Sequence, residues 1–205
     1  MQLRIFTSPD FISSEAHYIK ALFEAGLTCL HLRKPAASVF QYEQLIQQIP
    51  QQFYSKIYLH QYPELADKYS LAGYHLRSTD RVSMSEIAQK ELLEYFKNST
   101  MQLGTSVHHP TELERLADDY DYLTVSPVFS SISKLNYHPS YRWLVDIEKH
   151  KTTIVALGGI DTDTLELAYR RGFRSVACLG AIWGNPPLSL TKYKQLCQII
   201  HSIDQ

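Results

Sequence analysis

The stretch TIVALGGIDTDTLELAYRRGFRSVACLG, residues 153–180, decides the fold because it contains a complete strand–helix–strand unit. Thr153–Leu157 is a short apolar run rich in β-branched residues, which is typical of a strand buried on both faces. Thr162–Arg171 has helical spacing and ends at Gly172, and Ser175–Leu179 is a second apolar run. Two such strands joined by a helix predict a parallel βαβ unit.

The same alternation of short apolar runs and helical segments extends along the whole chain. The predicted strands are Gln2–Phe6, Thr28–Leu32, Ile57–His60, Gly73–Leu76, Met101–Val107, Tyr122–Val125, Thr153–Leu157 and Ser175–Leu179. The predicted helices are Ala16–Ala25, Ser38–Gln48, a short one opening at Pro63, Ser83–Phe96, Pro110–Leu116, Tyr141–Glu148, Thr162–Arg171 and Leu188–Ile203. Eight β/α units predict one α/β domain over residues 1–205, folded as a single (β/α)8 TIM barrel. A doubly wound open sheet shares the alternation, but the count of eight favours a closed barrel.

Composition narrows the possible functions of the chain. The 205 residues are 44% hydrophobic, enough for a sizeable core, and the net charge of −1 argues against nucleic-acid or anionic-membrane partners. No run approaches the roughly 20 apolar residues of a membrane helix, and Met1–Asp10 lacks a signal-peptide pattern. Cys29 and Cys178 lie in apolar runs, which predicts buried free thiols, and with Cys197 they make an odd set that favours a reducing, cytoplasmic setting.

Polar and basic residues recur where each predicted strand ends. In a barrel of this kind the carboxyl ends of the strands form the functional mouth. Basic residues near those ends are Arg33, Lys34, Arg77 and Lys134. The set predicts an anionic small molecule as ligand, the alternative being that solvated loops simply carry charge. The histidine spacing predicts no structural metal site, since the nearest approach to one, His108-His109, is a pair of adjacent residues.

Two glycine-containing strand ends predict a phosphate site. Gly158 and Gly159 have no side chains, so their backbone N–H groups can approach an anion closely, and a helix starting near Asp161 would add its positive end. Gly180 and Ala181 give the same openness one strand later. The loops after strands seven and eight often bind phosphate in such barrels. The alternative is a tight turn that needs glycine for backbone reasons alone.

Taken in order, several strand-end stretches resemble the thiamine phosphate synthase family and its relative, the thiazole tautomerase. The matching stretches are Leu30–Lys34, Gly73–Asp80, Gly104–His108, Ser126–Lys134, Val155–Ile160 and Val176–Ile182. The resemblance implies an enzyme of thiamine biosynthesis that joins an aminopyrimidine diphosphate to a thiazole phosphate and releases pyrophosphate. It also implies phosphorylated small molecules as substrates and magnesium as the cofactor; a homodimer is a further expectation.

The resemblance assigns roles to residues by position. Arg33 is expected to contact the diphosphate, Ser106 and Lys134 the pyrophosphate, and Asp80 the magnesium ion. The further expected substrate- and phosphate-binding residues are Ser131, Gly158, Gly159, Gly180, Ala181 and His60. Basic groups at a leaving diphosphate make physical sense because they offset the charge that develops on it.

The chain departs from the family pattern at the end of its second and third strands. The family has Asn-Asp where this chain has His60-Gln61, and it has a lysine where this chain has Pro35. Gln61 is uncharged, whereas magnesium prefers anionic oxygen ligands.

Two other functions therefore remain open. One is a tautomerase, which needs a phosphate anchor and a proton-transferring group but no metal. The tautomerase histidine position is Pro127 here, so His31, His60 or His108 would have to take its role. The other is a non-catalytic binder of thiazole phosphate or thiamine phosphate.

Overall fold

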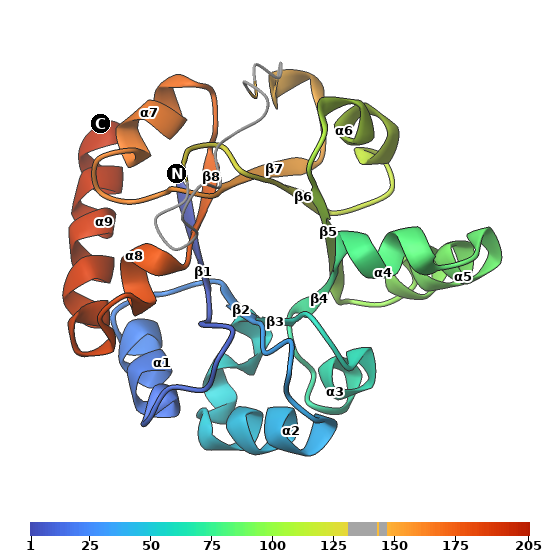
Figure 1. Cartoon of the computed structure of the whole chain (residues 1–205), viewed down its shortest axis with the longest axis horizontal. Helices are drawn as coiled ribbons and strands as arrows, with labels where there is room; N and C mark the ends of the chain where they lie inside the picture. Colours follow the sequence, from blue (N-terminus) through green and yellow to red (C-terminus); the bar gives the residue numbers. More distant parts are fainter. Residues whose placement is uncertain (131–142, 144–146) are drawn as a thin grey trace.

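The computed structural model describes residues 1–130, 143 and 147–205, and its strands form a closed parallel barrel in sequence order (Figure 1). The strands are β1 (Gln2–Phe6), β2 (Leu30–Leu32), β3 (Ile57–Leu59), β4 (Gly73–Leu76), β5 (Gln102–Val107), β6 (Tyr122–Val125), β7 (Thr153–Leu157) and β8 (Ser175–Cys178). β1 closes the barrel by pairing with β8, with Gln2 opposite Ser175 and Ile5 opposite Cys178. The predicted TIM barrel is confirmed.

Helices form a ring outside the strands (Figure 1). They are α1 (Glu15–Glu24), α2 (Val39–Gln48), α3 (Pro63–Lys68), α4 (Ser78–Ser83), α5 (Glu86–Lys97), α6 (Pro110–Leu116), α7 (Leu165–Arg170), α8 (Gly180–Trp183) and α9 (Ser189–Ile203). Short 3-10 turns cover Gln51–Lys56, Ile147–Lys149 and Pro186–Leu188. Most of the predicted helix Tyr141–Glu148 lies outside the described residues.

One predicted helix is wrong in its extent. The segment Ser83–Phe96 belongs to two helices, because α4 begins five residues earlier, at Ser78, and a break follows Ser83. Ser85 is extended and its side chain accepts the N–H of Ala88, which caps α5. This serine cap sets the start of α5 three residues after the predicted start at Ser83, and α4 itself was not predicted. The resulting α4–α5 arm projects from the ring (Figure 1).

The interior of the barrel is unusually polar. The apolar cluster inside the strands consists of Phe6, Cys29, Tyr58, Tyr122, Val155 and Ala177. Arg4 is buried beside it, with its guanidinium 4.3 Å from the centre of the Tyr122 ring, an arrangement that favours a cation–π interaction. The larger apolar core lies between the strands and the helices and carries most of the buried hydrophobic residues. Polar groups such as Arg4 are therefore buried inside the barrel, whereas the core between strands and helices is mostly apolar.

A buried ion pair ties the loop after β1 to the end of β2. Lys34 Nζ lies 2.6 Å from Glu15 and donates to the carbonyl oxygens of Ser8 and Asp10, each at 2.8 Å. Burial raises the pKa of Glu15 and lowers the pKa of Lys34, while the pairing of the two charges opposes both shifts. Lys34 was expected to contribute a positive charge near the mouth, but its ammonium group is buried and paired with Glu15.

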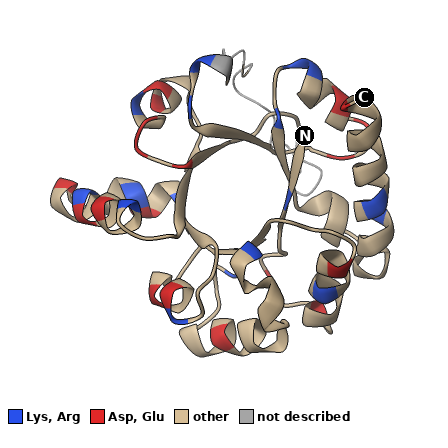
Figure 2. Ribbon diagram, turned by 180° about the vertical axis from the view of Figure 1, so that it is seen from behind, with Lys and Arg blue, Asp and Glu red and all other residues tan. Residues whose placement is uncertain are grey.

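Electrostatic features outside this pair are evenly spread. Figure 2 shows residues of both signs distributed among the outer helices, in keeping with the net charge of −1. Within the described part of the chain, no helix has the length and apolar character needed to cross a bilayer.

Replacing Lys34 by methionine should destabilise the protein strongly, because it leaves the Glu15 carboxylate buried without its partner. We expect a loss of about 3–5 kcal/mol in the free energy of unfolding, measured by urea denaturation. Lys20→Met is the matched control, since Lys20 pairs with Glu24 on an exposed helix face and should change stability by less than about 0.5 kcal/mol. Similar losses in the two variants would contradict this account of the buried pair.

The three thiols should differ sharply in reactivity. All three are free, Cys29 and Cys178 are buried as predicted, and Cys197 is half-buried on α9. Burial raises the pKa of Cys29 to about 12 and also raises that of Cys178, so neither forms thiolate near neutral pH. Iodoacetamide at pH 8 should label Cys197 in the native protein and all three cysteines after unfolding, as counted by mass spectrometry. Rapid native labelling of Cys29 would show that this description of the barrel interior is wrong.

Candidate active site at the carboxyl-terminal mouth

Arg33 lies at the end of β2 as a half-buried guanidinium with no carboxylate partner within 4.0 Å in the described ranges. Its backbone is fixed by Thr7, whose hydroxyl accepts the Arg33 N–H at 2.9 Å and lies 3.2 Å from the Arg33 carbonyl oxygen. Burial and the nearby Arg77 lower the pKa of Arg33, yet arginine stays protonated near neutral pH. A charged group in this setting is suited to binding an anion.

Arg77 and Asp80 form a two-point ion pair at the start of α4. Arg77 Nε lies 2.7 Å from one carboxylate oxygen of Asp80, and Nη2 lies 2.9 Å from the other. Hydrogen bonding to Asp80 raises the pKa of Arg77. Both oxygens of the expected magnesium ligand are therefore engaged in this arrangement.

The surroundings of Asp80 do not fit a magnesium site pre-formed by protein ligands. Gln61 donates its amide to the Pro35 carbonyl oxygen at 3.2 Å, and its buried amide oxygen has no partner among the described residues. No cluster of three carboxylate, histidine or cysteine ligands in the described ranges includes Asp80. One paired carboxylate and one neutral amide are a poor donor set for Mg²⁺, so the magnesium assignment stays a prediction.

Ser106 lies near the end of β5 and belongs to a hydrogen-bonded chain that runs into the barrel. Its hydroxyl is 2.8 Å from His75 Nε2, and His75 Nδ1 is 3.2 Å from the Tyr122 hydroxyl. Burial, together with the nearby charges of Arg4 and Arg33, lowers the pKa of His75 to about 3. His75 is therefore neutral at physiological pH and holds the Ser106 hydroxyl from the interior of the barrel.

The Gly158–Gly159 turn follows β7, and the structure gives its glycines a backbone role. Gly158 has φ of 95° and Gly159 has φ of 64°, in the region that favours glycine. A side chain on Gly159 would overlap the Ser130 carbonyl oxygen, and one on Gly158 would come within 2.9 Å of Pro127. The turn packs against the loop after β6, with Phe129 N–H donating to the Gly158 oxygen at 3.0 Å.

The helix after this turn begins later than predicted, at Leu165 rather than Thr162. The Asp161 carboxylate accepts the N–H groups of Asp163 and Thr164, at 2.9 and 3.0 Å. An anionic side chain thus occupies part of the positive end that was expected to attract phosphate. The phosphate role of Gly158 and Gly159 stays a prediction.

Gly180 and Ala181 open the four-residue helix α8 directly after β8. Both are half-buried, and the first N–H groups of a helix have no acceptor within the helix itself. Trp183 fixes the element by donating its indole N–H to the Phe6 carbonyl oxygen at 2.7 Å. The role of these two small residues at a phosphate stays a prediction.

Three histidines from neighbouring strand ends meet inside the barrel, a cluster that was not predicted from the sequence. Possible ligand atoms of His31, His60 and His75 all lie within 4.8 Å of one another. They come from β2, the residue after β3, and β4, which are adjacent in the barrel. His31 and His75 are the second-last residues of their strands and His60 directly follows β3, so their proximity becomes visible only once the strands are placed side by side.

Two predicted site residues cannot be placed. Ser131 and Lys134 lie outside the described residues. His108 is exposed, with Nδ1 3.1 Å from the Ser126 carbonyl oxygen.

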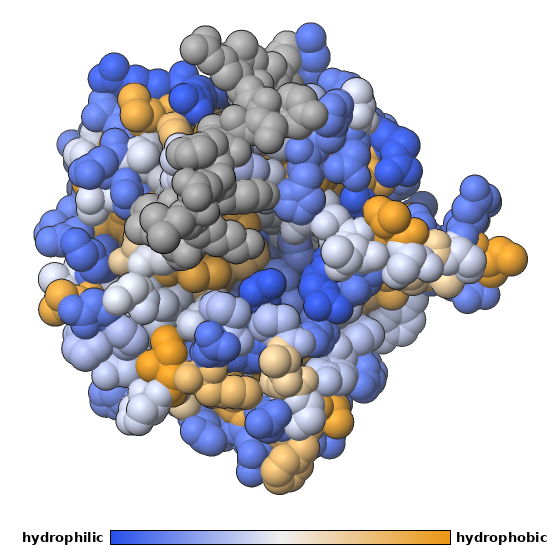
Figure 3. Space-filling model, in the orientation of Figure 1, coloured by the Kyte–Doolittle hydropathy of each residue, from blue (hydrophilic) through white to orange (hydrophobic). Residues whose placement is uncertain are grey.

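The face that carries the mouth shows hydrophilic surface near its centre (Figure 3). Apolar side chains stand out on the α4–α5 arm, where Val82 and Ile87 are 75% and 71% exposed.

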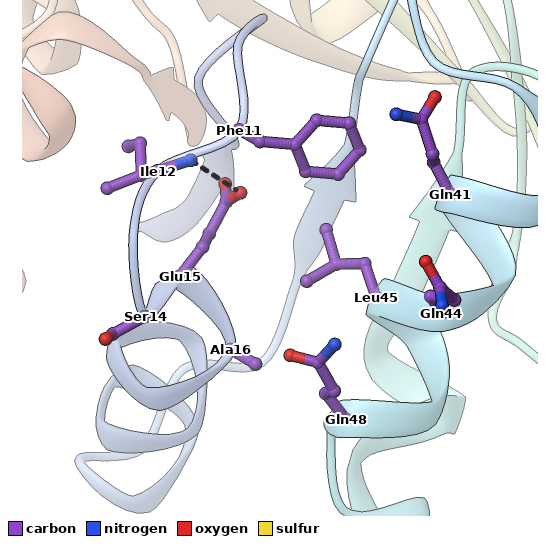
Figure 4. Close-up of a pocket in the computed structure, with 9 residues that line it drawn as sticks. All are labelled: Phe11, Ile12, Ser14, Glu15, Ala16, Gln41, Gln44, Leu45 and Gln48. Atoms are coloured by element: carbon purple, nitrogen blue, oxygen red, sulfur yellow. Dashed lines mark hydrogen bonds between the residues drawn. The ribbon is translucent and has the colours of Figure 1, made fainter.

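The hollow between α1 and α2 lacks this combination of groups. It has a volume of about 390 Å³, with Phe11 and Leu45 facing it and glutamine side chains along α2 (Figure 4). Its only carboxylate, Glu15, accepts the Ile12 N–H and is already paired with Lys34. The mouth is therefore the candidate active site.

The closed barrel, with its polar groups collected at the carboxyl ends of the strands, defines a TIM-barrel enzyme. The family model described as thiamine monophosphate synthase matches residues 4–182. The chain therefore belongs to the thiamine monophosphate synthase family, among the transferases of thiamine biosynthesis.

Individual relatives agree with this assignment. A thiamine-phosphate synthase of Caldicellulosiruptor saccharolyticus is 26% identical over 201 residues, covering 94% of this chain and 86% of the relative. One of Lysinibacillus sphaericus is 29% identical over 174 residues, covering 80% and 78%. The crystal structure of a thiamine phosphate pyrophosphorylase from Bacteroides thetaiotaomicron has a TM-score of 0.77 at 27% identity and covers 98% of both chains.

The backbone role of Gly159 can be tested against a glycine that shares only the positive φ. Gly159→Ala combines backbone strain with an overlap at Ser130, whereas Gly26→Ala, at φ 101°, meets nothing within 4 Å. We expect Gly26→Ala to lower the free energy of unfolding by about 1–2 kcal/mol and Gly159→Ala by clearly more, measured by urea denaturation. If Gly159→Ala were the milder change, the close approach of the two loops would be disproved.

Proposed function

We propose that the chain catalyses the synthase reaction, joining an aminopyrimidine diphosphate to a thiazole phosphate. The bond between the pyrimidine methylene carbon and the diphosphate oxygen breaks, and the oxygen leaves with the electron pair as pyrophosphate. The thiazole nitrogen then donates its lone pair to the carbocation-like carbon and forms the new C–N bond. Family membership over residues 4–182 and the charge arrangement at the mouth support the proposal.

The observation that carries this proposal is the half-buried guanidinium of Arg33. Within the described ranges it has no carboxylate partner, whereas Arg77 is paired with Asp80 and Lys34 with Glu15. Arg33 is therefore the described cation at the mouth that remains available to offset charge on a leaving diphosphate. Partial burial strengthens this interaction, because fewer water molecules compete for the guanidinium.

Ser106 is proposed as a second contact to the diphosphate. To donate its hydroxyl proton to a phosphate oxygen, Ser106 must accept a hydrogen bond from His75, so His75 must carry its proton on Nε2. His75 Nδ1 then accepts from the Tyr122 hydroxyl. His75 is in this account a positioning residue that fixes the direction of the Ser106 hydroxyl.

The remaining assignments follow the same division of the site. Lys134 is proposed at the pyrophosphate, Ser131 at the thiazole phosphate, and Gly158, Gly159, Gly180 and Ala181 around that phosphate through their backbone. His60 is proposed beside the substrate at the end of β3. A cytoplasmic location is proposed on the strength of the three free thiols. The expected homodimer stays a prediction.

An end-point assay tests the function directly. The protein is mixed with both synthase substrates, with and without Mg²⁺, and thiamine phosphate and pyrophosphate are measured. Formation of the two products in equal amounts is the expected result. A separate assay supplies the unaromatised thiazole carboxylate phosphate; its turnover, without synthase activity, would identify a tautomerase. Binding of thiazole phosphate with neither activity would identify a binder.

Arg33→Met should lower kcat/KM of the synthase reaction by about 10²–10³, because it removes a charge that acts on the leaving group. Arg170→Met is the control: Arg170 pairs with Glu166 on the exposed end of α7, so its loss should change kcat/KM less than twofold. Equal activity in the two variants would remove Arg33 from the mechanism.

A further inference from the structure

The trihistidine cluster has the composition of a metal-binding site. His31 Nδ1 lies 3.1 Å from His60 Nε2, and His60 stacks on His75 with ring centres 4.3 Å apart. All three side chains are at least 98% buried. His31 Nε2 is buried without a hydrogen-bond partner, which shows that hydrogen bonds within the described part of the chain do not satisfy the cluster.

The three imidazoles are suited to ligation because they are neutral. Burial lowers the pKa of His31 and His60 well below the ordinary value for histidine, and that of His75 to about 3. A neutral imidazole keeps one lone pair free, and metal ions bind that form without first displacing a proton.

The spacing of the rings is close to that of a coordinated set. Imidazole nitrogens bind zinc at about 2.0–2.1 Å, so three ligands of one ion lie a little over 3 Å apart. The pair His31–His60 already has this separation, and His75 offers a third ligand nitrogen in a set whose atoms all lie within 4.8 Å of one another. Whichever His75 nitrogen faces the ion, the other keeps Tyr122 or Ser106 as a hydrogen-bond partner, the kind of contact that orients metal-bound histidines.

We propose that His31, His60 and His75 form a binding site for a divalent transition-metal ion, of the zinc or cobalt class, at the base of the mouth. Imidazole ligands favour such ions over magnesium. Three protein ligands leave a fourth position for water or an anionic oxygen. Of these two, the anionic oxygen is expected, because Arg4 places a buried positive charge nearby. The proposal does not depend on the synthase reaction.

Cobalt binding to the full chain tests this site. The protein is stripped with a chelator, titrated with Co²⁺, and followed by visible absorption, with bound metal counted by elemental analysis. We expect one Co²⁺ per chain with the intense absorption of a low-coordinate site. X-ray absorption of the Zn²⁺-loaded wild-type protein should show three imidazole nitrogens at about 2.0–2.1 Å.

Variants assign the ligands. His60→Asn and His31→Gln should each raise the Kd for Co²⁺ at least about 100-fold, as expected for the loss of a direct ligand. His17→Asn, at an exposed position on α1, should leave the Kd within twofold. Zn²⁺ should raise the Tm of the wild type and not that of His60→Asn. Absence of stoichiometric binding, no imidazole shell in the wild-type X-ray absorption, or unchanged affinity in a folded His60→Asn would overturn the proposal.

Discussion

Closure of the barrel between β1 and β8 is the constraint on which the remaining structure depends. The pairing runs from Gln2 opposite Ser175 to Ile5 opposite Cys178, and it joins the two ends of the sequence into one sheet without edges. Once the ring is closed, every strand ends at the same rim. Side chains as far apart in the sequence as those of Arg33 and Ala181, 148 residues, are thereby brought to one end of the molecule.

The closed ring also determines what lies within it. Parallel strands buried on both faces normally carry continuous apolar runs, whereas several strands here include buried polar residues, such as Thr105, Thr124 and Ser175. The larger polar groups are Arg4 and the three histidines, which point into the barrel and are nearly inaccessible to water. Burying so many polar groups opposes folding unless they interact with one another or with a ligand. Aromatic stacking of Phe6 on His31, with ring centres 4.3 Å apart, partly offsets this burden.

Much of the fold could be predicted from the sequence because apolar runs mark buried strands directly. Four strands, including Gly73–Leu76 and Tyr122–Val125, have the predicted bounds. The break between α4 and α5 was not predicted, because a serine cap leaves the apolar spacing nearly unchanged. Periodicity reports which face of a helix is buried, and it is insensitive to a short interruption between two helices.

The candidate site was harder to predict than the fold because residue type does not specify direction. Arg33 and Lys34 are neighbours of equal charge, yet one remains available at the mouth and the other is buried against Glu15. Asp80 was predicted at the end of a strand, and the structure places it in the first turn of α4, where it pairs with Arg77. The histidine cluster needed the lateral alignment of β2, β3 and β4, which no local pattern contains.

The contact between the loops after β6 and β7 has a mechanical consequence. Val128 and Phe129 donate backbone hydrogen bonds to Leu157 and Gly158, and the absence of side chains lets the two loops approach this closely. These hydrogen bonds join the two loops, so a shift of one loop requires a shift of the other. A ligand that displaces one of these loops would therefore also displace the other, so that two barrel units would change conformation together.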